Sequence, residues 1–317
     1  MKTVYITTMF ITALLMLTLP LCAKNSIDNL PVSALPLSEA QKPDADETVR
    51  VKLTETGEIT SITLKDYLFG VVAAEMPALY EEEALKAQAV AAYTYYTVKK
   101  EADEIKDYDI SDDFTTDQAF ITVAAAREKW GDGADEFESK IRRCISEVLG
   151  QRVLFEGKPA YTVYHAISFG VTENAAEVWG GEYPYLISVD SSFDKTEKNY
   201  LSSATFTAAE FKTAMSPYAE VTNTEENQIT DLIRTAAGGV KSASVAGVSV
   251  SGLDIRTALG LRSANFEVSF AEGVYTFNVK GYGHSVGMSQ HGAHYLAMQG
   301  KNYKEILKHY YTGCEVE

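Results

Sequence analysis

The order of hydrophobic and polar positions predicts both strands and helices in this chain. Val49–Leu53 and Glu58–Thr63 are two short segments with the composition of strands. Leu64–Ala74 has apolar residues at helical spacing, and a longer helix is predicted from Glu81 to about Lys100. Because strands and helices do not alternate regularly, we expect an α+β fold, with mixed helices and mainly antiparallel strands in one compact domain over residues 48–317.

Later segments continue this mixture, with one less regular stretch between them. Val240–Val250 and Phe266–Val279 alternate like strands, and Asn302 is placed to cap a C-terminal helix that runs to about Tyr311. Residues 101–145 include the least patterned part of the chain, which is acidic and contains a Gly-Asp-Gly turn. We therefore expect 101–145 to form a surface excursion with a helix or two.

The N-terminal residues differ from the rest of the chain. Val4–Ala23 contains no charged residue and follows Lys2, so residues 1–24 have the length and flank of a membrane anchor or a signal peptide. A single-pass, uncleaved anchor in the cell membrane is favoured slightly over a cleaved signal, and in both cases the remainder is exported. Residues 25–47 carry prolines among polar residues, which predicts an extracytoplasmic linker.

Composition narrows the possible functions. In 317 residues, Lys and Arg number 28 and Asp and Glu number 44, which gives a net charge of −16. Phosphate backbones repel such a charge, so we expect no nucleic-acid partner. Cys144 and Cys314 form no Cys-x-x-Cys pair, which argues against a zinc ribbon or a thioredoxin-like site and favours free thiols over a disulfide.

Glu75, in the run Ala-Ala-Glu-Met-Pro, is the first candidate catalytic residue. Met76 precedes Pro77, so the helix should end near Glu75. A carboxylate at a helix C-terminus feels the negative end of the helix dipole, and apolar neighbours reduce its solvation. Both effects raise its pKa toward the range that a general acid requires. On this pattern alone, a partly exposed glutamate without a catalytic role is the more common case.

Two further segments place polar residues among apolar ones. Gln88 lies in a helix of small side chains, where it makes either a structural hydrogen bond or a contact that orients Glu75 or a substrate hydroxyl. His165 and Ser168 lie at the end of a predicted strand, where residues three apart face opposite sides, so a nucleophile pair is not expected. Polar substrate contacts and a buried structural histidine remain the two interpretations of this segment.

The glycine-rich segment Gly281–Gly292 predicts a tight loop where the backbone approaches a ligand or another backbone. His291 and His294 share a helix face, as metal ligands sometimes do, but no carboxylate or thiolate lies beside them in the sequence. We therefore rank a metal below substrate-contact and structural roles, and expect no metal and no cofactor. The candidate substrate contacts of this segment are His284, Ser289 and Gln290.

Four segments, in this order, resemble the stage II sporulation protein D family, which includes the amidase-enhancer-like proteins. They are Thr63–Tyr96, Val178–Leu186, Ser251–Phe266 and Gly281–Gly313. The resemblance implies a membrane-anchored lytic transglycosylase of peptidoglycan, which cleaves between N-acetylmuramic acid and N-acetylglucosamine and leaves a 1,6-anhydro end. It also implies septal wall remodelling and engulfment during sporulation, glycan strands stripped of peptides as substrate, and stage II sporulation proteins P and M as partners.

The resemblance points to particular residues as well. The glutamate before Met-Pro is the family's catalytic acid, which is Glu75 here, and Gln88, His165, Ser168 and Tyr185 match site-lining positions. Some members bind zinc through a Cys/His cluster ahead of a glutamine near the position of Gln118. No Cys or His precedes Gln118 in that stretch, so we expect no zinc there and keep Gln118 as a substrate contact.

A single prominent carboxylate suits this reaction. Hydrolysing glycosidases normally use two carboxylates, whereas in a transglycosylase the sugar's own C6 hydroxyl attacks and no water is activated. The main alternative is a non-catalytic glycan-binding enhancer of a cell-wall amidase. A metal hydrolase built on His284, His291 and His294 is a more distant one.

Overall fold

The computed structural model describes residues 47–102, 107–222 and 224–317. These residues form two compact units: a helical unit, residues 47–197 with 284–317, and a sheet unit, residues 198–283. The mixed helices and mainly antiparallel sheets agree with the expected α+β class. The single domain expected for 48–317 is instead divided, because the chain leaves the helical unit after Glu197 and returns to it at His284.

The predicted anchor (1–24) lies outside the described residues, as does all of the predicted linker except residue 47. Within the part of the chain that the structure describes, no helix combines the length and the apolar character that crossing a membrane requires.

The helical unit begins with a hairpin and a capped helix. Strands β1 (Thr48–Lys52) and β2 (Ile59–Thr63) pair antiparallel, and the Thr63 hydroxyl accepts a hydrogen bond from the Asp66 amide at 3.1 Å to cap α2 (Leu64–Glu75). Met76 adopts an extended conformation (φ −116°, ψ 143°) ahead of Pro77 and ends the helix. The sequence prediction that the helix stops at Glu75 is confirmed.

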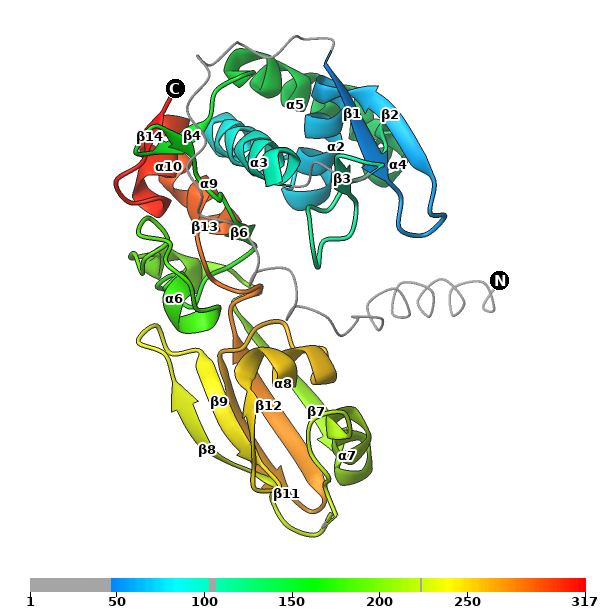
Figure 1. Ribbon diagram of the computed structural model, residues 1–317, viewed down its shortest axis with the longest axis vertical. Helices are drawn as coiled ribbons and strands as arrows, with labels where there is room; N and C mark the ends of the chain where they lie inside the picture. Colours follow the sequence, from blue (N-terminus) through cyan, green and yellow to red (C-terminus); the bar gives the residue numbers. More distant parts are fainter. Residues whose placement is uncertain (1–46, 103–106, 223) are drawn as a thin grey trace. The chain divides into compact units, whose positions relative to one another are not determined.

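Helix α3 (Glu82–Ala102) packs against α2, α5, α9 and α10 and is the centre of the helical unit (Figure 1). Small buried residues such as Ala84, Ala87 and Ala91 let these helices approach closely. Its acidic first turn and its Lys99–Lys100 end complement the helix dipole.

Residues 101–145 are not only a surface excursion, which corrects the sequence prediction. Strand β3 (Ile110–Ser111) pairs with β1, and α4 (Val123–Trp130), the turn η1 (Gly131–Gly133) and α5 (Ala134–Val148) follow. One face of α5 is buried in the core, because Ile141, Cys144, Ile145 and Val148 recur at helical spacing.

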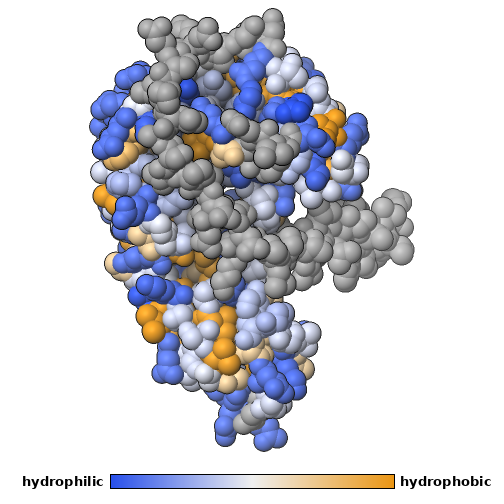
Figure 2. Space-filling view, in the orientation of Figure 1, coloured by the Kyte–Doolittle hydropathy of each residue, from blue (hydrophilic) through white to orange (hydrophobic). Residues whose placement is uncertain are grey.

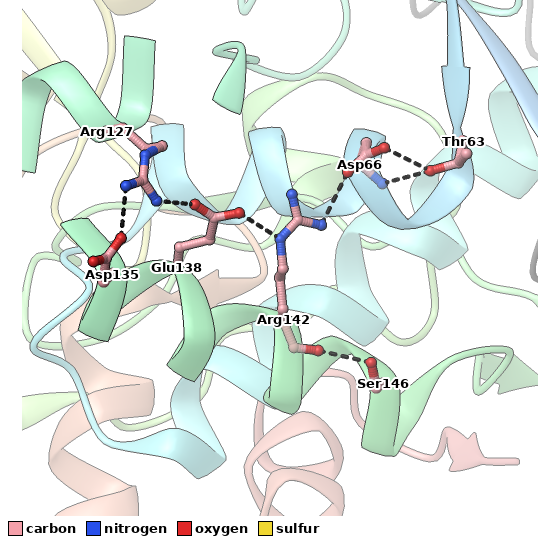
Figure 3. A network of polar contacts seen from close by, with 7 residues as sticks. All are labelled: Thr63, Asp66, Arg127, Asp135, Glu138, Arg142 and Ser146. Atoms are coloured by element: carbon pink, nitrogen blue, oxygen red, sulfur yellow. Dashed lines mark hydrogen bonds and ion pairs between the residues drawn. The ribbon is translucent and has the colours of Figure 1, made fainter. Parts of the chain in front are cut away.

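A polar network fastens α5 to α2 and α4 (Figure 3). The Arg142 guanidinium donates to Asp66 at 2.9 Å and to Glu138 at 2.8 Å, and Arg127 of α4 donates to Glu138 at 2.6 Å. Arg142 also lies over the Phe69 ring, 4.7 Å from its centroid. A branched network of this kind holds three helices in register more firmly than an isolated surface pair does.

Short elements complete the helical unit. Strand β14 (Glu315–Val316) pairs with β4 (Val153–Phe155), which pairs with β5 (Lys158–Pro159). Strand β6 (Tyr164–His165) runs parallel to β13 (Met288–Ser289), so two segments far apart in the sequence are joined. The other elements are α6 (Ala175–Val178), η2 (Ser192–Thr196), α9 (Gln290–Met298) and α10 (Tyr303–Tyr310).

The sheet unit contains two antiparallel three-stranded sheets. One has the order β11 (Phe266–Ala271), β12 (Val274–Lys280), β7 (Leu201–Thr207), and the other β10 (Val248–Ser251), β9 (Val240–Val245), β8 (Ile229–Arg234). Helix α7 (Ala208–Met215) lies beside β7 and β12, and α8 (Gly252–Leu259) beside β9 and β10 (Figure 1). The segments Val240–Val250 and Phe266–Val279, each expected as strand, are two hairpins.

Each unit has its own buried core. On the face shown in Figure 2, hydrophilic side chains predominate and apolar ones appear in separate patches. Both Cys144 and Cys314 are buried free thiols, and burial raises their pKa values to about 11 and about 12. Neither thiol is therefore activated as a nucleophile.

Candidate active site

Glu75 closes α2 as a half-buried carboxyl group with few donors. The Gln290 side-chain amide donates to its Oε2 at 2.9 Å, and the Ala119 backbone amide also hydrogen-bonds to it. Burial raises the pKa of Glu75 above its ordinary value, and these two hydrogen bonds only partly oppose that effect. The carboxyl group thus keeps its proton to a higher pH than an exposed glutamate, as a general acid requires.

The Ala119 amide reaches Glu75 because its segment lies directly on α2. At Gly70 of α2, an added Cβ atom would come within 2.3 Å of the Phe120 ring and 2.4 Å of the Ile121 carbonyl oxygen. The Ile121 amide also donates to the Gly70 carbonyl at 3.3 Å. The close packing at this glycine therefore sets the distance between the segment and the end of the helix.

Gln290 comes to Glu75 from the other end of the sequence. It is the first residue of α9, and the Ser289 hydroxyl caps that helix by accepting from the Gly292 amide at 3.1 Å. Ser289 is also in β13, where it is paired with His165 of β6. Of the candidates in Gly281–Gly292, Gln290 is the one that contacts Glu75, whereas Ser289 supports the backbone beside it.

Gln118 joins two tyrosines near Glu75. Its amide nitrogen donates to the Tyr67 hydroxyl at 2.6 Å, and its amide oxygen accepts from the Tyr164 hydroxyl at 2.6 Å. Burial raises the pKa of both hydroxyls well above the ordinary tyrosine value, and the charge of Glu75 contributes to both shifts. Gln88 is fully buried and close enough to Tyr164 to lower the pKa of its hydroxyl, but among the described residues neither polar atom of the Gln88 side chain has a partner at hydrogen-bonding distance.

His165 and His284 form a second group, next to Tyr164. His165 Nδ1 donates to the Val286 carbonyl at 3.0 Å, His284 Nδ1 accepts from the Val286 amide at 3.1 Å, and the two rings lie 5.6 Å apart. The half-buried Trp179 ring lies 5.1 Å from His284. Sequence reasoning did not select Trp179 as a site residue, although a tryptophan followed by two glycines was a usable signal.

Ser168 and Tyr185 have structural contacts away from Glu75. The Ser168 amide donates to Asp194 at 2.9 Å. The Tyr185 hydroxyl accepts from the Tyr161 amide at 2.8 Å, its ring packs on Phe155, and burial raises its pKa to about 12. These contacts supply scaffold roles for both residues.

Asp194 and Glu197 were missed by sequence reasoning. His291 Nδ1 lies 3.0 Å from Asp194 Oδ1, and its Nε2 lies 3.3 Å from Glu197 Oε2. No carboxylate lies beside these histidines in the sequence, but the fold brings two carboxylates to His291. His294 is elsewhere on α9: it stacks on Tyr80 and accepts from the Glu81 amide at 3.1 Å.

The donor sets do not suit a metal ion. Among the residues that the structure describes, no three or more His, Cys, Asp and Glu side chains are grouped so that they could hold one. The two carboxylates at His291 occupy opposite ring nitrogens, whereas a metal would need one of those nitrogens for itself.

Comparison with known proteins identifies the family. A family model described as Stage II sporulation protein matches residues 52–155. Stage II sporulation protein D of Bacillus amyloliquefaciens is 38% identical over 272 residues, which cover 85% of this chain and 78% of the relative. The protein of the same name from Bacillus subtilis is 35% identical over the same shares. The amidase enhancer of Bacillus subtilis is 28% identical over 78% of this chain and 39% of the relative. The chain belongs to the stage II sporulation protein D family.

Proposed function

We propose that this protein is a lytic transglycosylase of peptidoglycan, which cleaves the bond between N-acetylmuramic acid and N-acetylglucosamine and leaves a 1,6-anhydro end. The observation that carries the proposal is Glu75, a half-buried carboxyl group with a raised pKa that is held by two neutral donors. Among the described residues, no second carboxylate shifts the pKa of Glu75. This favours a reaction that needs one carboxyl group over hydrolysis, which normally uses two.

The chemistry assigned to Glu75 has two steps. The protonated carboxyl group donates its proton to the glycosidic oxygen as the bond from C1 of the muramic acid breaks. The C6 hydroxyl of the same sugar then bonds to C1, and the Glu75 carboxylate takes the hydroxyl proton, which restores the acid. Proton, leaving group and attacking oxygen are all accounted for without water.

Neighbouring residues have supporting roles in this proposal. Gln290 fixes the orientation of the carboxyl group, since its amide donates to Oε2. Tyr164 and Gln118 keep a buried polar wall beside it, and His165, His284 and Trp179 are the candidate sugar contacts further along. Burial raises the pKa of Glu75, which favours its protonated form.

Product analysis tests the proposal. The purified full chain is incubated with glycan strands stripped of peptides, and the products are analysed by mass spectrometry. Products with 1,6-anhydro ends are expected. Reducing ends would show a hydrolase, and intact strands that nevertheless bind would favour the alternative below. Cleavage is expected to fall on the alkaline side of the pH profile, as Glu75 loses its proton.

A non-catalytic role as enhancer of a cell-wall amidase is the second candidate. It is favoured by the relative named amidase enhancer, which shares 28% identity with this chain. Adding the protein to a purified cell-wall amidase would then raise amide-bond cleavage, and Glu75→Gln would leave that stimulation intact. The transglycosylase proposal expects cleavage without any amidase.

We further propose action at the septal and engulfing membrane during sporulation, because two relatives are named stage II sporulation protein D. Stage II sporulation proteins P and M are the proposed partners, and residues 1–24 the proposed single-pass anchor. Deleting residues 1–24 is expected to move the protein from the membrane fraction to the soluble fraction while glycan cleavage continues. A truncated protein that still sediments with membranes would contradict the anchor.

A further inference from the structure

His291 is held by a carboxylate at each ring nitrogen. Its Nδ1 lies 3.0 Å from Asp194 and its Nε2 lies 3.3 Å from Glu197, and the three side chains are 9%, 0% and 23% exposed in that order. Two carboxylates therefore restrain the His291 ring from opposite sides, and Asp194 is the more deeply buried of the two.

Asp194 is itself fixed from several directions. Its Oδ2 accepts from the Ser168 amide and from the Ser191 hydroxyl, each at 2.9 Å, and the Ser191 hydroxyl is 3.0 Å from that of Tyr310 in α10. Burial alone would raise the pKa of Asp194, but hydrogen bonds from His291, Ser168 and Ser289 hold it below its usual range. Asp194 is thus a fixed, ionised point inside the helical unit.

This anchor acts on the first turn of α9. His291 follows Gln290 directly, its amide donates to the Ala166 carbonyl at 3.1 Å, and Ser289, the helix cap, hydrogen-bonds to Asp194. At Gly292, an added Cβ atom would lie 1.9 Å from the Tyr310 hydroxyl, so the turn packs closely against α10. Residues 289–292 are therefore held on both sides of Gln290.

We propose that Asp194 and Glu197, acting through His291, are positioning residues for Glu75: they fix the first turn of α9 so that the Gln290 amide stays within hydrogen-bonding distance of the acid. The inference deepens the proposed function and rests on it for the role of Glu75. A displacement of about 1 Å at a catalytic group can cost on the order of 10²-fold in rate. The 2.9 Å hydrogen bond from Gln290 is the link that such a displacement would break.

The test must distinguish effects on the groups around Glu75 from effects on the groups around His291. The groups that face Glu75 are the Gln290 and Ala119 amides and the hydroxyls of Tyr67 and Tyr164, whose pKa values the charge of Glu75 raises. The titratable groups around the His291 cluster, on the elements packed against α9, are Asp194, Glu197, Tyr80, His294 and Tyr310.

Two isosteric variants of the full chain each keep one of the two contacts that His291 makes, either with Asp194 or with Glu197. Asparagine places its amide nitrogen near the position of Nδ1 and can still donate to Asp194, whereas glutamine places it near Nε2 and can donate only toward Glu197. We expect His291→Gln to lower kcat on stripped glycan strands about 10- to 100-fold with KM changed less than about twofold. His291→Asn should recover most of the loss.

A second readout does not require cleavage. Gln290 lowers the pKa of Glu75, so losing its hydrogen bond should raise that pKa. The Glu75 carboxyl group is titrated by ¹³C NMR in the native chain, in Gln290→Leu as the reference for a lost bond, and in His291→Gln. An upward shift in His291→Gln, in the direction of Gln290→Leu, is expected.

The control is His309→Asn, which removes another imidazole together with its hydrogen bond, the one from His309 Nε2 to the Asp190 carbonyl at 2.8 Å. It should change neither kcat nor the pKa of Glu75. If His291→Gln fails to fold, Ser191→Ala replaces it, since it removes one donor from Asp194 and leaves His291 in place. It should give a smaller shift in the same direction.

The outcomes distinguish this inference from the proposed function. If the native chain does not cleave glycan but His291→Gln raises the pKa of Glu75, the function is wrong and the positioning role stands. If the native chain cleaves and the pKa of Glu75 is the same in His291→Gln or Ser191→Ala, the positioning role is overturned. Equal losses of kcat in His291→Asn and His291→Gln would overturn the role of Asp194.

Discussion

Two carboxyl groups of the helical unit, Glu75 and Asp194, have pKa shifts of opposite sign although both are withdrawn from water. Burial pushes both pKa values upward. Glu75 has one side-chain amide and one backbone amide as donors, and its pKa stays raised. Asp194 has an imidazole, serine hydroxyls and a backbone amide, and its pKa is lowered. The number of hydrogen-bond donors therefore decides which buried carboxyl group can act as an acid and which is a fixed anion.

The largest expected effect follows from removing the proton of Glu75. Glu75→Gln keeps the shape and a hydrogen-bonding group but cannot transfer a proton. Losing general acid–base catalysis costs about 10²–10⁴-fold in rate, and in the proposed reaction one group serves as both acid and base, so the loss should lie at the upper end. Rates on stripped glycan strands, measured side by side with the native chain, check this.

Folding and binding must be intact for that result to count. Circular dichroism and sedimentation with glycan should be unchanged in Glu75→Gln. Cleavage at more than about a tenth of the native rate, well outside the expected range, would mean that Glu75 is not the acid.

Asp194→Asn is expected to produce the largest loss of stability. It removes a buried negative charge from His291 and from several donors, and breaking such a pair costs on the order of 3–5 kcal/mol. Because the folded pKa is lowered, the stabilisation by ionised Asp194 is complete above the unfolded pKa of about 3.9 and is lost as the pH falls through the lower folded value. Denaturant unfolding at pH 7 and at acid pH measures both.

Asp254→Asn is the matched control for that variant. Asp254 accepts from the Ser251 hydroxyl at 2.7 Å in the sheet unit, but it has no counterpart to His291 among the contacts described for it. Its loss should cost about 1 kcal/mol. Equal destabilisation by the two variants would show that the imidazole adds nothing to the Asp194 cluster.

A smaller effect of opposite sign is expected for the stability of Glu75→Gln. The folded pKa of Glu75 is raised, so its ionisation disfavours the folded state as the pH rises from the unfolded pKa of about 4.3 to the folded value. Glutamine removes this cost. The Tm of the variant should exceed that of the native chain at pH 7, and the difference should shrink near pH 4. A lower Tm at pH 7 would contradict the account of Glu75.

Glu197→Gln should have the smallest effect. Its side chain is 23% exposed and its contact with His291 is 3.3 Å, so solvent screens the pair. We expect a destabilisation below about 1 kcal/mol. A loss as large as that of Asp194→Asn, measured in the same denaturant series, would move the anchor of His291 from Asp194 to Glu197.

Local rules predicted the helix end and the direction of the pKa shift at Glu75 but not the residues that contact it. Met76 before Pro77 placed the helix end at Glu75, and the apolar neighbours gave the direction of its pKa shift, because these effects act within a few residues. Gln290 was selected from its loop, but its contact with Glu75 joins residues 215 apart in sequence. Asp194 comes from a short turn without a periodic pattern, so no local signal connected it to His291.

The same reasoning explains the error over residues 101–145. Acidic composition and a Gly-Asp-Gly turn suggested surface, and many side chains of α4 and α5 are indeed exposed. The apolar stripe from Phe137 through Ile141 and Ile145 to Val148 was nevertheless present at helical spacing. The spacing of the apolar residues predicts a buried helix face, which the acidic composition of the segment does not.

The proton affinity of Glu75 depends on Gly70, which lies five residues earlier in α2 and carries no side chain. An added methyl group there would overlap the Phe120 ring and the Ile121 carbonyl, so helix and segment would have to move apart. The Ala119 amide would move with them, and Glu75 would lose a donor without any change to the active-site residues themselves. The absence of a side chain at Gly70 thus links the packing of α2 to the pKa of Glu75 at its end. Gly70→Ala would alter the pH dependence of the protein through a change in backbone spacing.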